Sequence, residues 1–246
     1  MTTSTEQLND AIAALNSAAG AYNGKKTEID NAVAAAIAAI PNNFKVFYVD
    51  QVGGDDASPG TVAEPLASIS RAVALTPRGG ICQVRLASDY ILQERVELQR
   101  IQLEVIGQTV RRALLLRWVE IDNQIDYLGQ FTPLHGSRVT LRDIDVAFPD
   151  DPVVSFRYDH MRGFISGTGV DTQSSVDAAF HGCTFDIGAS TVGSIFGNIP
   201  GYIVVRFLNG AAFTGSWEGR ITDRAGGVGV DPNSVLRIIN TNLSWI

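Results

Sequence analysis

The sequence predicts a mainly β chain preceded by a helical N-terminal segment, and three observations support this fold class. Residues 1–40 carry apolar side chains at helical spacing. From residue 44 onward, short β-branched or aromatic runs alternate with Gly, Asp and Asn. Three of these runs also resemble one another, which indicates a repeated unit. We therefore expect a helical segment at 1–41, a strand with a short helix at 42–80, and a β-rich body at 81–246.

Composition excludes several classes of protein. The 246 residues are 45% hydrophobic and 18% charged, which is apolar enough for a packed core and argues against a disordered chain. The net charge of −7 argues against a sequence-independent nucleic-acid binder. The two cysteines, Cys82 and Cys183, form no CxxC motif and predict neither a zinc ribbon nor a disulfide framework. No apolar run reaches the roughly 18 residues of a membrane span, so no membrane insertion is expected.

The N-terminal segment carries a heptad pattern. Its spacing is 4-3 without a slip, and one position of the series, Lys26, is charged while the other nine are apolar or aromatic. Those nine are Leu8, Ile12, Leu15, Ala19, Tyr22, Ile29, Val33, Ala36 and Ile40. Such a repeat predicts a left-handed coiled coil and therefore an oligomer. Gly20 and Gly24 weaken a helix, so a helical hairpin with a joint near Gly24 is the alternative.

The next stretch changes character. Residues 44–50 favour a strand, and residues 53–61 are rich in turn formers. Residues 65–75 predict a short helix with Pro65 in its first turn and apolar side chains on one face.

Short strands are expected from residue 81 to the end. The predicted runs are Cys82–Leu86, Leu103–Ile106, Ala113–Trp118, Val139–Val146, Val153–Tyr158 and Tyr202–Leu208. Three segments, which start at Val139, Phe180 and Ile238, superimpose without gaps, and a weaker copy starts at Ala212. Each of the three has apolar residues at offsets 0, 5 and 7 and a polar residue at offset 4. This pattern predicts strand, tight turn and strand in a solenoid, with an ordinary β-sandwich as the alternative.

One stretch has a specific resemblance. It reads Phe47-Tyr48-Val49-Asp50, then Gly54-Asp55-Asp56, then Pro59-Gly60-Thr61, then Pro65, Ser68-Ile69 and Ala72-Val73. The pattern resembles the opening of right-handed parallel β-helix proteins of the pectate-lyase-like superfamily. The resemblance implies that this stretch caps the first coil of a β-helix. The implied cap residues are Tyr48, Asp50, Gly54, Asp55, Asp56, Gly60, Pro65, Ile69, Ala72 and Val73.

A coiled coil before such an opening resembles a bacteriophage tail fibre or tailspike. The resemblance implies a homotrimer that is made in the host cytoplasm and located in the virion. Its partners would be other tail or baseplate proteins at the N-terminus and a further virion protein at the C-terminus, with a host-surface glycan as another candidate. The N-terminus lacks the basic and apolar regions of a secretory signal, which disfavours the rival interpretation as a cellular surface adhesin.

Phage proteins of this kind are often polysaccharide depolymerases, so a tailspike glycosidase or lyase is the alternative function. Hydrolysis needs two carboxylates roughly 5–10 Å apart, and the weak candidates are Asp143, Asp145 and Asp186. Single Asp residues at turns usually accept backbone hydrogen bonds, so a structural role in attachment and adsorption is favoured over catalysis. No cofactor is expected, and no metal, because Asp50, Asp55 and Asp56 lack the spacing of an EF-hand.

Arginines in the first half of the body alternate with acidic residues. The cluster comprises Arg95, Arg100, Arg111, Arg112 and Arg117, interleaved with Glu94, Glu97, Glu104 and Glu120. Because the guanidinium group pairs well with carboxylates, we expect cross-strand or intersubunit ion pairs here, not a polyanion site. The histidines, His135, His160 and His181, form no metal-binding motif.

Overall fold

The computed structural model of the chain describes residues 3–39, 43–158, 161–167, 176–190, 192–197, 203–217, 220–221 and 238–239. The chain divides into two compact units, Met1–Asn42 and Asn43–Ile246. Within the described ranges the fold is mainly β, with several parallel sheets and two helices. Ile40, His160 and residues 240–245 of the last predicted repeat copy lie outside these ranges.

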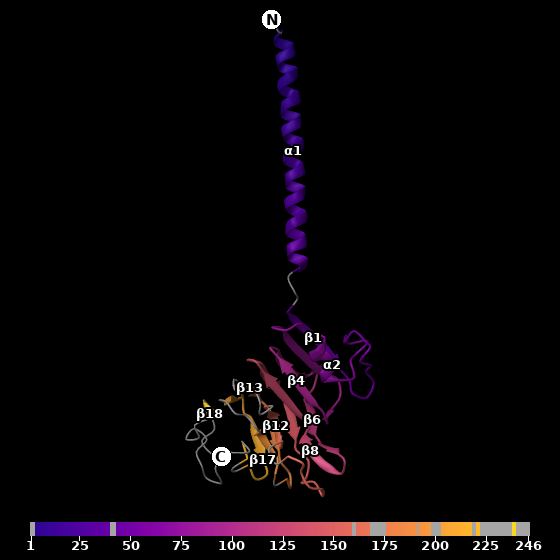
Figure 1. The fold of residues 1–246 in the computed structure, drawn as a ribbon, viewed down its shortest axis with the longest axis vertical. Helices are drawn as coiled ribbons and strands as arrows, with labels where there is room; N and C mark the ends of the chain where they lie inside the picture. Colours follow the sequence, from indigo (N-terminus) through magenta and orange to yellow (C-terminus); the bar gives the residue numbers. More distant parts are fainter. Residues whose placement is uncertain are drawn as a thin grey trace. The chain divides into compact units, whose positions relative to one another are not determined.

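The N-terminal unit contains one helix, α1 (Ser4–Ala39), which is drawn as an uninterrupted coil in Figure 1. Glu6 lies in its first turn, where its carboxylate accepts a hydrogen bond of 2.8 Å from the Thr3 amide. Gly20 and Gly24 lie inside the helix, and the joint that the hairpin alternative needs near Gly24 is not formed. An added Cβ at either glycine would meet no atom within 4 Å.

The body is organised around a seven-stranded parallel sheet, called sheet A here. Its spatial order is β1, β2, β5, β10, β13, β16 and β18. The bounds are β1 (Phe44–Val49), β2 (Ile81–Leu86), β5 (Gln102–Gly107), β10 (Arg138–Arg142), β13 (Val176–His181), β16 (Ile203–Leu208) and β18 (Ile238–Ile239).

Two further parallel sheets complete the body. Sheet B contains β3 (Tyr90–Leu92), β6 (Arg112–Leu116), β11 (Ile144–Ala147), β14 (Thr184–Asp186) and β17 (Ala212–Thr214). Sheet C contains β4 (Arg95–Gln99), β9 (Gln130–Leu134), β12 (Gly163–Ser166) and β15 (Ser194–Gly197). An antiparallel hairpin, β7 (Trp118–Ile121) with β8 (Gln124–Leu128), stands between β6 and β9 in the chain.

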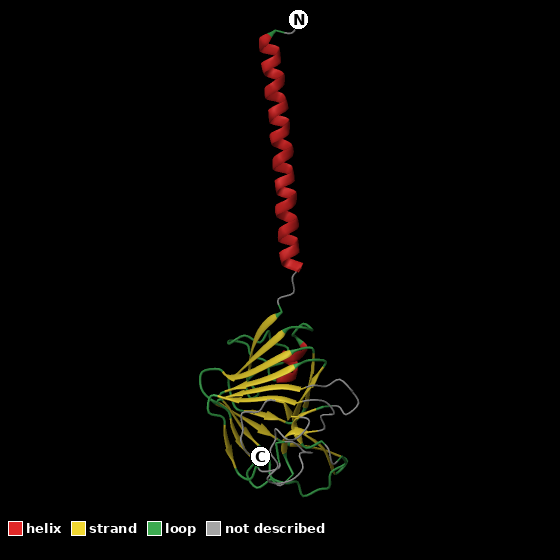
Figure 2. Cartoon of the chain, turned by 90° about the vertical axis from the view of Figure 1, so that its left-hand side faces the viewer, coloured by secondary structure: helices red, strands yellow, loops and turns green. Residues whose placement is uncertain are grey.

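The chain visits the three sheets in a repeating order. It passes through β2, β3 and β4, then β5, β6 and β9, then β10, β11 and β12, then β13, β14 and β15. Each cycle, called a coil here, adds one strand to each sheet, and the loops at the strand ends form its corners (Figure 2). The antiparallel hairpin is therefore an insertion at a corner between sheets B and C.

Inward side chains of successive coils stack in register. In sheet A one row of buried residues comprises Phe47, Val84, Val105, Leu141, Phe180 and Phe207. In sheet B the corresponding row comprises Tyr90, Leu114, Val146, Phe185 and Phe213. The Phe180 and Phe207 ring centroids are 5.2 Å apart, so aromatic packing continues from coil to coil. Both cysteines are free and buried in this core, and burial raises the pKa of each thiol to about 11.

The short helix begins later than the sequence predicts. Helix α2 (Ile69–Ala74) starts after Ser68, whose hydroxyl accepts a hydrogen bond of 3.1 Å from the Arg71 amide. The predicted first turn at Pro65 is wrong, because Leu66 lies in a parallel bridge with Val49.

The run Val139–Val146 is two strands, β10 and β11, with Asp143 at the corner between them, as the strand–turn–strand repeat predicts. Two other predicted strand runs differ from the structure. The run that starts at Ala113 ends at Leu116, and Trp118 opens the hairpin. Val153–Tyr158 forms no strand; its Phe156 makes an isolated bridge with Ile125.

The predicted repeat has the correct elements in a shifted register. Phe180 lies opposite Leu141 and not opposite Val139, a shift of two residues. The weaker copy, which starts at Ala212, does not begin at the position of Phe180: Ala212 lies opposite Thr184, and Phe207 is the residue opposite Phe180. Ile238 lies opposite Ile203. Because side chains alternate with a period of two, a shift of two residues keeps each side chain on the predicted face.

Candidate functional site

A pocket of about 450 Å³ lies at the corner between sheets A and B. Its lining comes from the loop between β5 and β6 and from the start of the turn between β10 and β11. The lining residues are Ile106, Gly107, Gln108, Thr109, Val110, Arg111, Arg142 and Asp143. We call it the Asp143 pocket.

Asp143 has a left-handed backbone, with φ of 51°. Its amide donates a hydrogen bond of 2.9 Å to the carbonyl oxygen of His181 in the next coil. A Cβ at Gly182 would lie 2.7 Å from Asp143 Oδ1, so a larger residue at position 182 would collide with this carboxylate. Gly182 itself has φ of 60°, which glycine adopts at no steric cost.

The other two candidate carboxylates do not line this pocket. Asp145 accepts a hydrogen bond of 2.6 Å from Arg111 Nε, and the same guanidinium donates to Thr184 Oγ1 at 2.7 Å. Asp186 accepts a hydrogen bond of 3.0 Å from the Gly188 amide and thereby holds a turn. The structure therefore places one of the three carboxylates in the pocket lining; Asp145 is held by Arg111, which is itself in the lining, and Asp186 holds a turn outside it.

Residues that the sequence did not link to Asp143 lie near it in the fold. Arg142 donates to Glu104, and Glu104 also accepts a hydrogen bond of 2.8 Å from Gln83 Nε2. His181 lies opposite Arg142 in the sheet. Burial and the Arg142 guanidinium lower the pKa of His181, while Glu104 and Asp143 oppose this shift. Only the pairing of β5, β10 and β13 brings these side chains together, so no local sequence signal could have identified them.

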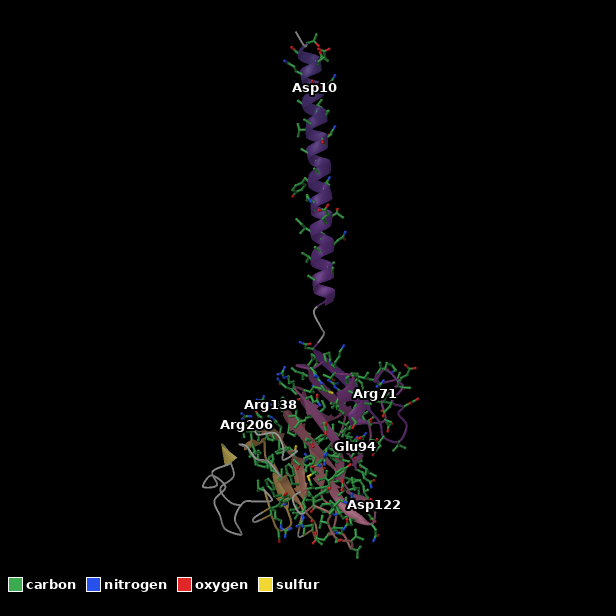
Figure 3. All side chains as sticks on the ribbon, viewed as in Figure 1. Asp10, Arg71, Glu94, Asp122, Arg138 and Arg206 are labelled. Carbon is green, nitrogen blue, oxygen red and sulfur yellow. The ribbon has the colours of Figure 1, made fainter. Side chains whose placement is uncertain are left out.

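A second charged group spans three strands on the outer face of sheet A. Asp177 on β13 accepts hydrogen bonds from Arg138 at 2.5 Å and from Arg206 at 2.9 Å. Figure 3 shows the two arginines next to each other. Of the predicted arginine cluster, Arg111 forms such a pair within the described residues, with Asp145 and not with one of the interleaved glutamates. Exposed pairs of this kind stabilise a fold by about 1 kcal/mol or less.

The opening stretch covers the free edge of β1. The Tyr48 amide donates to the Gly60 carbonyl at 2.9 Å, and the Leu66 amide donates to the Tyr48 carbonyl at 2.9 Å. Both edge groups of β1 at Tyr48 are thus paired within the chain. Ile69, Ala72 and Val73 of α2 are buried in the core.

The acidic residues of this stretch accept hydrogen bonds from nearby groups. Asp56 binds the Ala67 and Ser68 amides at 3.0 and 2.9 Å, and Asp55 binds the Ala57 amide at 2.9 Å. Asp50 accepts from the Ser88 hydroxyl at 2.8 Å, and this hydrogen bond lowers the pKa of the Asp50 carboxyl.

Two glycines of the opening stretch are required by close packing. A Cβ at Gly54 would lie 2.2 Å from the Leu66 carbonyl oxygen. At Gly60, where φ is 78°, it would lie 2.6 Å from a ring carbon of Phe47.

Within the described parts of the chain, no group of three His, Cys, Asp or Glu side chains could hold a metal ion. In the same residues, no helix has both the length and the apolarity to cross a membrane.

The heptad face of α1 is the largest exposed apolar feature of the N-terminal unit. Every side chain from Thr3 to Ala36 is exposed. The exposed fractions on this face are Leu8 60%, Ile12 48%, Leu15 70%, Tyr22 71%, Ile29 61% and Val33 51%. Lys26 interrupts the face and pairs with Asp30 on its own helix at 3.7 Å.

Comparison of the chain with protein-family models, with curated proteins and with solved structures gives no match.

Proposed function

We propose that the chain is the subunit of a homotrimeric bacteriophage tail fibre or spike that attaches to the tail and contacts the host surface. In this proposal α1 forms a parallel coiled coil, and the body is a right-handed parallel β-helix. The observation that carries the proposal is the exposed heptad face of α1, together with a body built of stacked parallel coils.

The helix supports association because its apolar face has no cover within its own unit. Isolated helices are marginal in water, and a large apolar side chain that is fully buried contributes about 1.5–3 kcal/mol. Six large apolar side chains on one face of α1 are at least 48% exposed. Association of α1 with copies of itself would bury this face along its whole length. Lys26 would then be a polar layer of the kind that sets register and oligomer state.

The body supports the β-helix assignment through its order of strands. The chain returns to each sheet after visiting the other two, and neighbouring strands in each sheet are parallel. Connections between parallel strands are right-handed in about 98% of cases, which favours a right-handed coil. The covered edge of β1 and the buried face of α2 agree with a cap on the first coil.

A contact function without a chemical step is favoured by the partners of the candidate carboxylates. Asp145 is held by Arg111, and Asp186 holds a turn. Glycoside hydrolysis generally needs a pair of carboxylates on either side of the bond. The Asp143 pocket has one of the candidate carboxylates in its lining.

Two measurements test the proposal. Light scattering of the full chain should give three times the subunit mass of 26.4 kDa. Antibody labelling of purified phage particles should place the protein at the tail. A monomer in solution would contradict the coiled coil, and particles without label would contradict the virion role.

A polysaccharide depolymerase is the second candidate, favoured by Asp143 in a pocket beside Arg111 and Arg142. The purified chain should then release reducing ends, or unsaturated ends for a lyase, from host polysaccharide. Asp143→Asn should abolish release, and Asp186→Asn, at a turn outside the pocket lining, should retain it. No release by the unmodified chain would exclude this candidate for that polysaccharide.

A further inference from the structure

A second pocket, of about 270 Å³, lies at a different corner of the body, between sheets C and A. We call it the corner pocket; it is lined by Arg78, Gln99, Arg100 and His135. Arg78 precedes β2, Gln99 and Arg100 join β4 to β5, and His135 follows β9. Three successive coils therefore each contribute a nitrogen-rich side chain to one small cavity.

Backbone hydrogen bonds stack these turns on one another. The Gly79 amide donates to the Arg100 carbonyl at 2.8 Å, and the Arg100 amide donates to the Leu134 carbonyl at 3.4 Å. Paired strands lie about 4.8 Å apart, so side chains at equivalent corners are near neighbours. Strand pairing in the sheets therefore brings Arg78, Arg100 and His135 together, although they are far apart in sequence.

The lining is cationic although the chain as a whole is acidic. It contains two guanidinium groups, one imidazole and one amide, and none of the lining side chains is a carboxylate. Arg78 donates to Gln99 Oε1 at 2.8 Å, which leaves further N–H groups of this guanidinium available. No described carboxylate pairs with Arg78 or Arg100. Arg100 therefore has no cross-strand ion pair within the described residues, and intersubunit pairing of the arginine cluster stays a prediction.

Two residues that line the corner pocket have a left-handed backbone, which carries a steric cost for residues with a side chain. Arg100 has φ of 56° and His135 has φ of 54°. Glycine and asparagine adopt this left-handed region most readily, and other residues pay a steric cost. The corner between β16 and β17 uses Asn209 and Gly210 in the same region. Strained residues persist where another requirement holds them, and here the strain coincides with the two guanidinium groups of Arg78 and Arg100 in one pocket lining.

We propose that the corner pocket binds an oxyanion, the carboxylate or phosphate group of an acidic glycan. The arginine fork matches both groups by paired hydrogen bonds, which an ammonium group cannot provide. The cavity is near the lower end of the range for small-molecule sites, which fits one sugar residue or one phosphate group. The biological meaning of this site rests on the proposed function, because it supplies the chemistry by which the protein would recognise a host surface.

Calorimetric titration of the full chain tests the proposal with three probes: oligogalacturonate, inorganic phosphate and a neutral malto-oligosaccharide. At least one of the two anions should bind, more weakly as salt is added, and the neutral sugar should not. Preference for oligogalacturonate identifies a carboxylate, and preference for phosphate identifies a phosphate group. Binding of neither anion overturns the proposal.

Substitutions locate the site. Arg78→Gln and Arg100→Gln should each weaken binding by roughly tenfold or more, as expected for loss of a charged hydrogen-bond partner. Arg117→Gln is the matched control, because Arg117 is exposed, lies outside the lining and makes the same change of charge. Equal weakening by all three variants, or by none, would contradict binding in the corner pocket.

Arg100→Gly separates binding from folding. Glycine relieves the left-handed backbone, so the melting temperature should not fall, whereas binding should be lost. Unchanged binding in this variant would overturn the proposal. The oligomeric state tests the proposed function separately: a trimer that binds no anion refutes this inference alone, and a monomer that binds anions refutes the trimer alone.

Discussion

Large apolar side chains are exposed on the helix α1, whereas in the β body most of them are buried. In sheet A of the body, strands such as β2 and β10 alternate buried and outward residues, and each coil covers the inward side chains of the previous one. In α1, apolar residues of similar size are spaced for burial, yet at least 48% of each large one is exposed. The body therefore buries its apolar side chains within one chain, whereas in the proposed function α1 would bury its apolar face against other copies of itself. Stability of the body should be independent of concentration, and that of the helix should not.

The largest effect is expected from a charge on the heptad face. Leu15→Asp would place one carboxylate per subunit in the core of the coiled coil, where unpaired charges are strongly unfavourable. We expect complete loss of association and of helical circular dichroism from α1, with an unchanged body. Asn16→Asp, one residue away and off the heptad face, adds the same charge and should leave the mass measured by light scattering unchanged.

The reciprocal test removes a ring from the body. Phe180 is fully buried, 4.9 Å from the Phe185 centroid and 5.2 Å from that of Phe207. Phe180→Ala should lower the free energy of unfolding of the body by about 3–5 kcal/mol. Tryptophan fluorescence during chemical denaturation measures this, because α1 contains no Trp. Tyr22→Ala should instead change association and leave the denaturation midpoint of the body unaltered.

A smaller effect is expected at the opening of the body. Gly60→Ala combines a left-handed backbone with a contact against Phe47 and should cost about 2–4 kcal/mol. Gly210→Ala is the control, since φ is 76° there but no atom lies within 4 Å of the added Cβ. It should cost about 1 kcal/mol in the same denaturation experiment. Equal losses would mean that packing against Phe47 does not matter.

The smallest effect concerns pH. Burial and Arg142 hold the folded-state pKa of His181 below its ordinary value of 6.5. The unfolded chain therefore binds the proton more readily, so this stability is full above pH 6.5 and is lost as pH falls through the lowered folded-state pKa. His181→Gln should reduce the fall in melting temperature of the body between pH 7.5 and 5.5. No His lies in α1, whose association should not change between the variants.

The fold was predictable where one face of an element is apolar. Strands such as β2 and β10 alternate strictly, so their runs were visible in the sequence. In sheet C, β12 and β15 were missed because they are four residues long and buried on both faces, which removes the alternation. The repeat was displaced by two residues because a period of two makes neighbouring registers equivalent in pattern.

The residues of the two pockets could not be grouped from the sequence, because the number of residues between equivalent corners varies from coil to coil. Asp143 was a candidate from sequence, but its neighbours Glu104 and His181 come from adjacent coils. Arg78, Arg100 and His135 meet because their turns are stacked, and no fixed spacing in the sequence relates them. Hydrogen-bonded register, which the sequence does not display, determines both pockets.

Because the coils differ in length, the outer surface of the body can vary while its inner row of stacked residues stays the same. The stacked residues Val84, Val105, Leu141, Phe180 and Phe207 are 21, 36, 39 and 27 residues apart, although they occupy equivalent positions in sheet A. The difference is taken up at corners, as by the β7–β8 hairpin with its tip at Asp122 and Asn123. Insertions and deletions at these corners can thus remodel the outer surface while the inner row keeps its register. The body is a scaffold on which new binding loops could be grafted at the hairpin tip without redesigning the core.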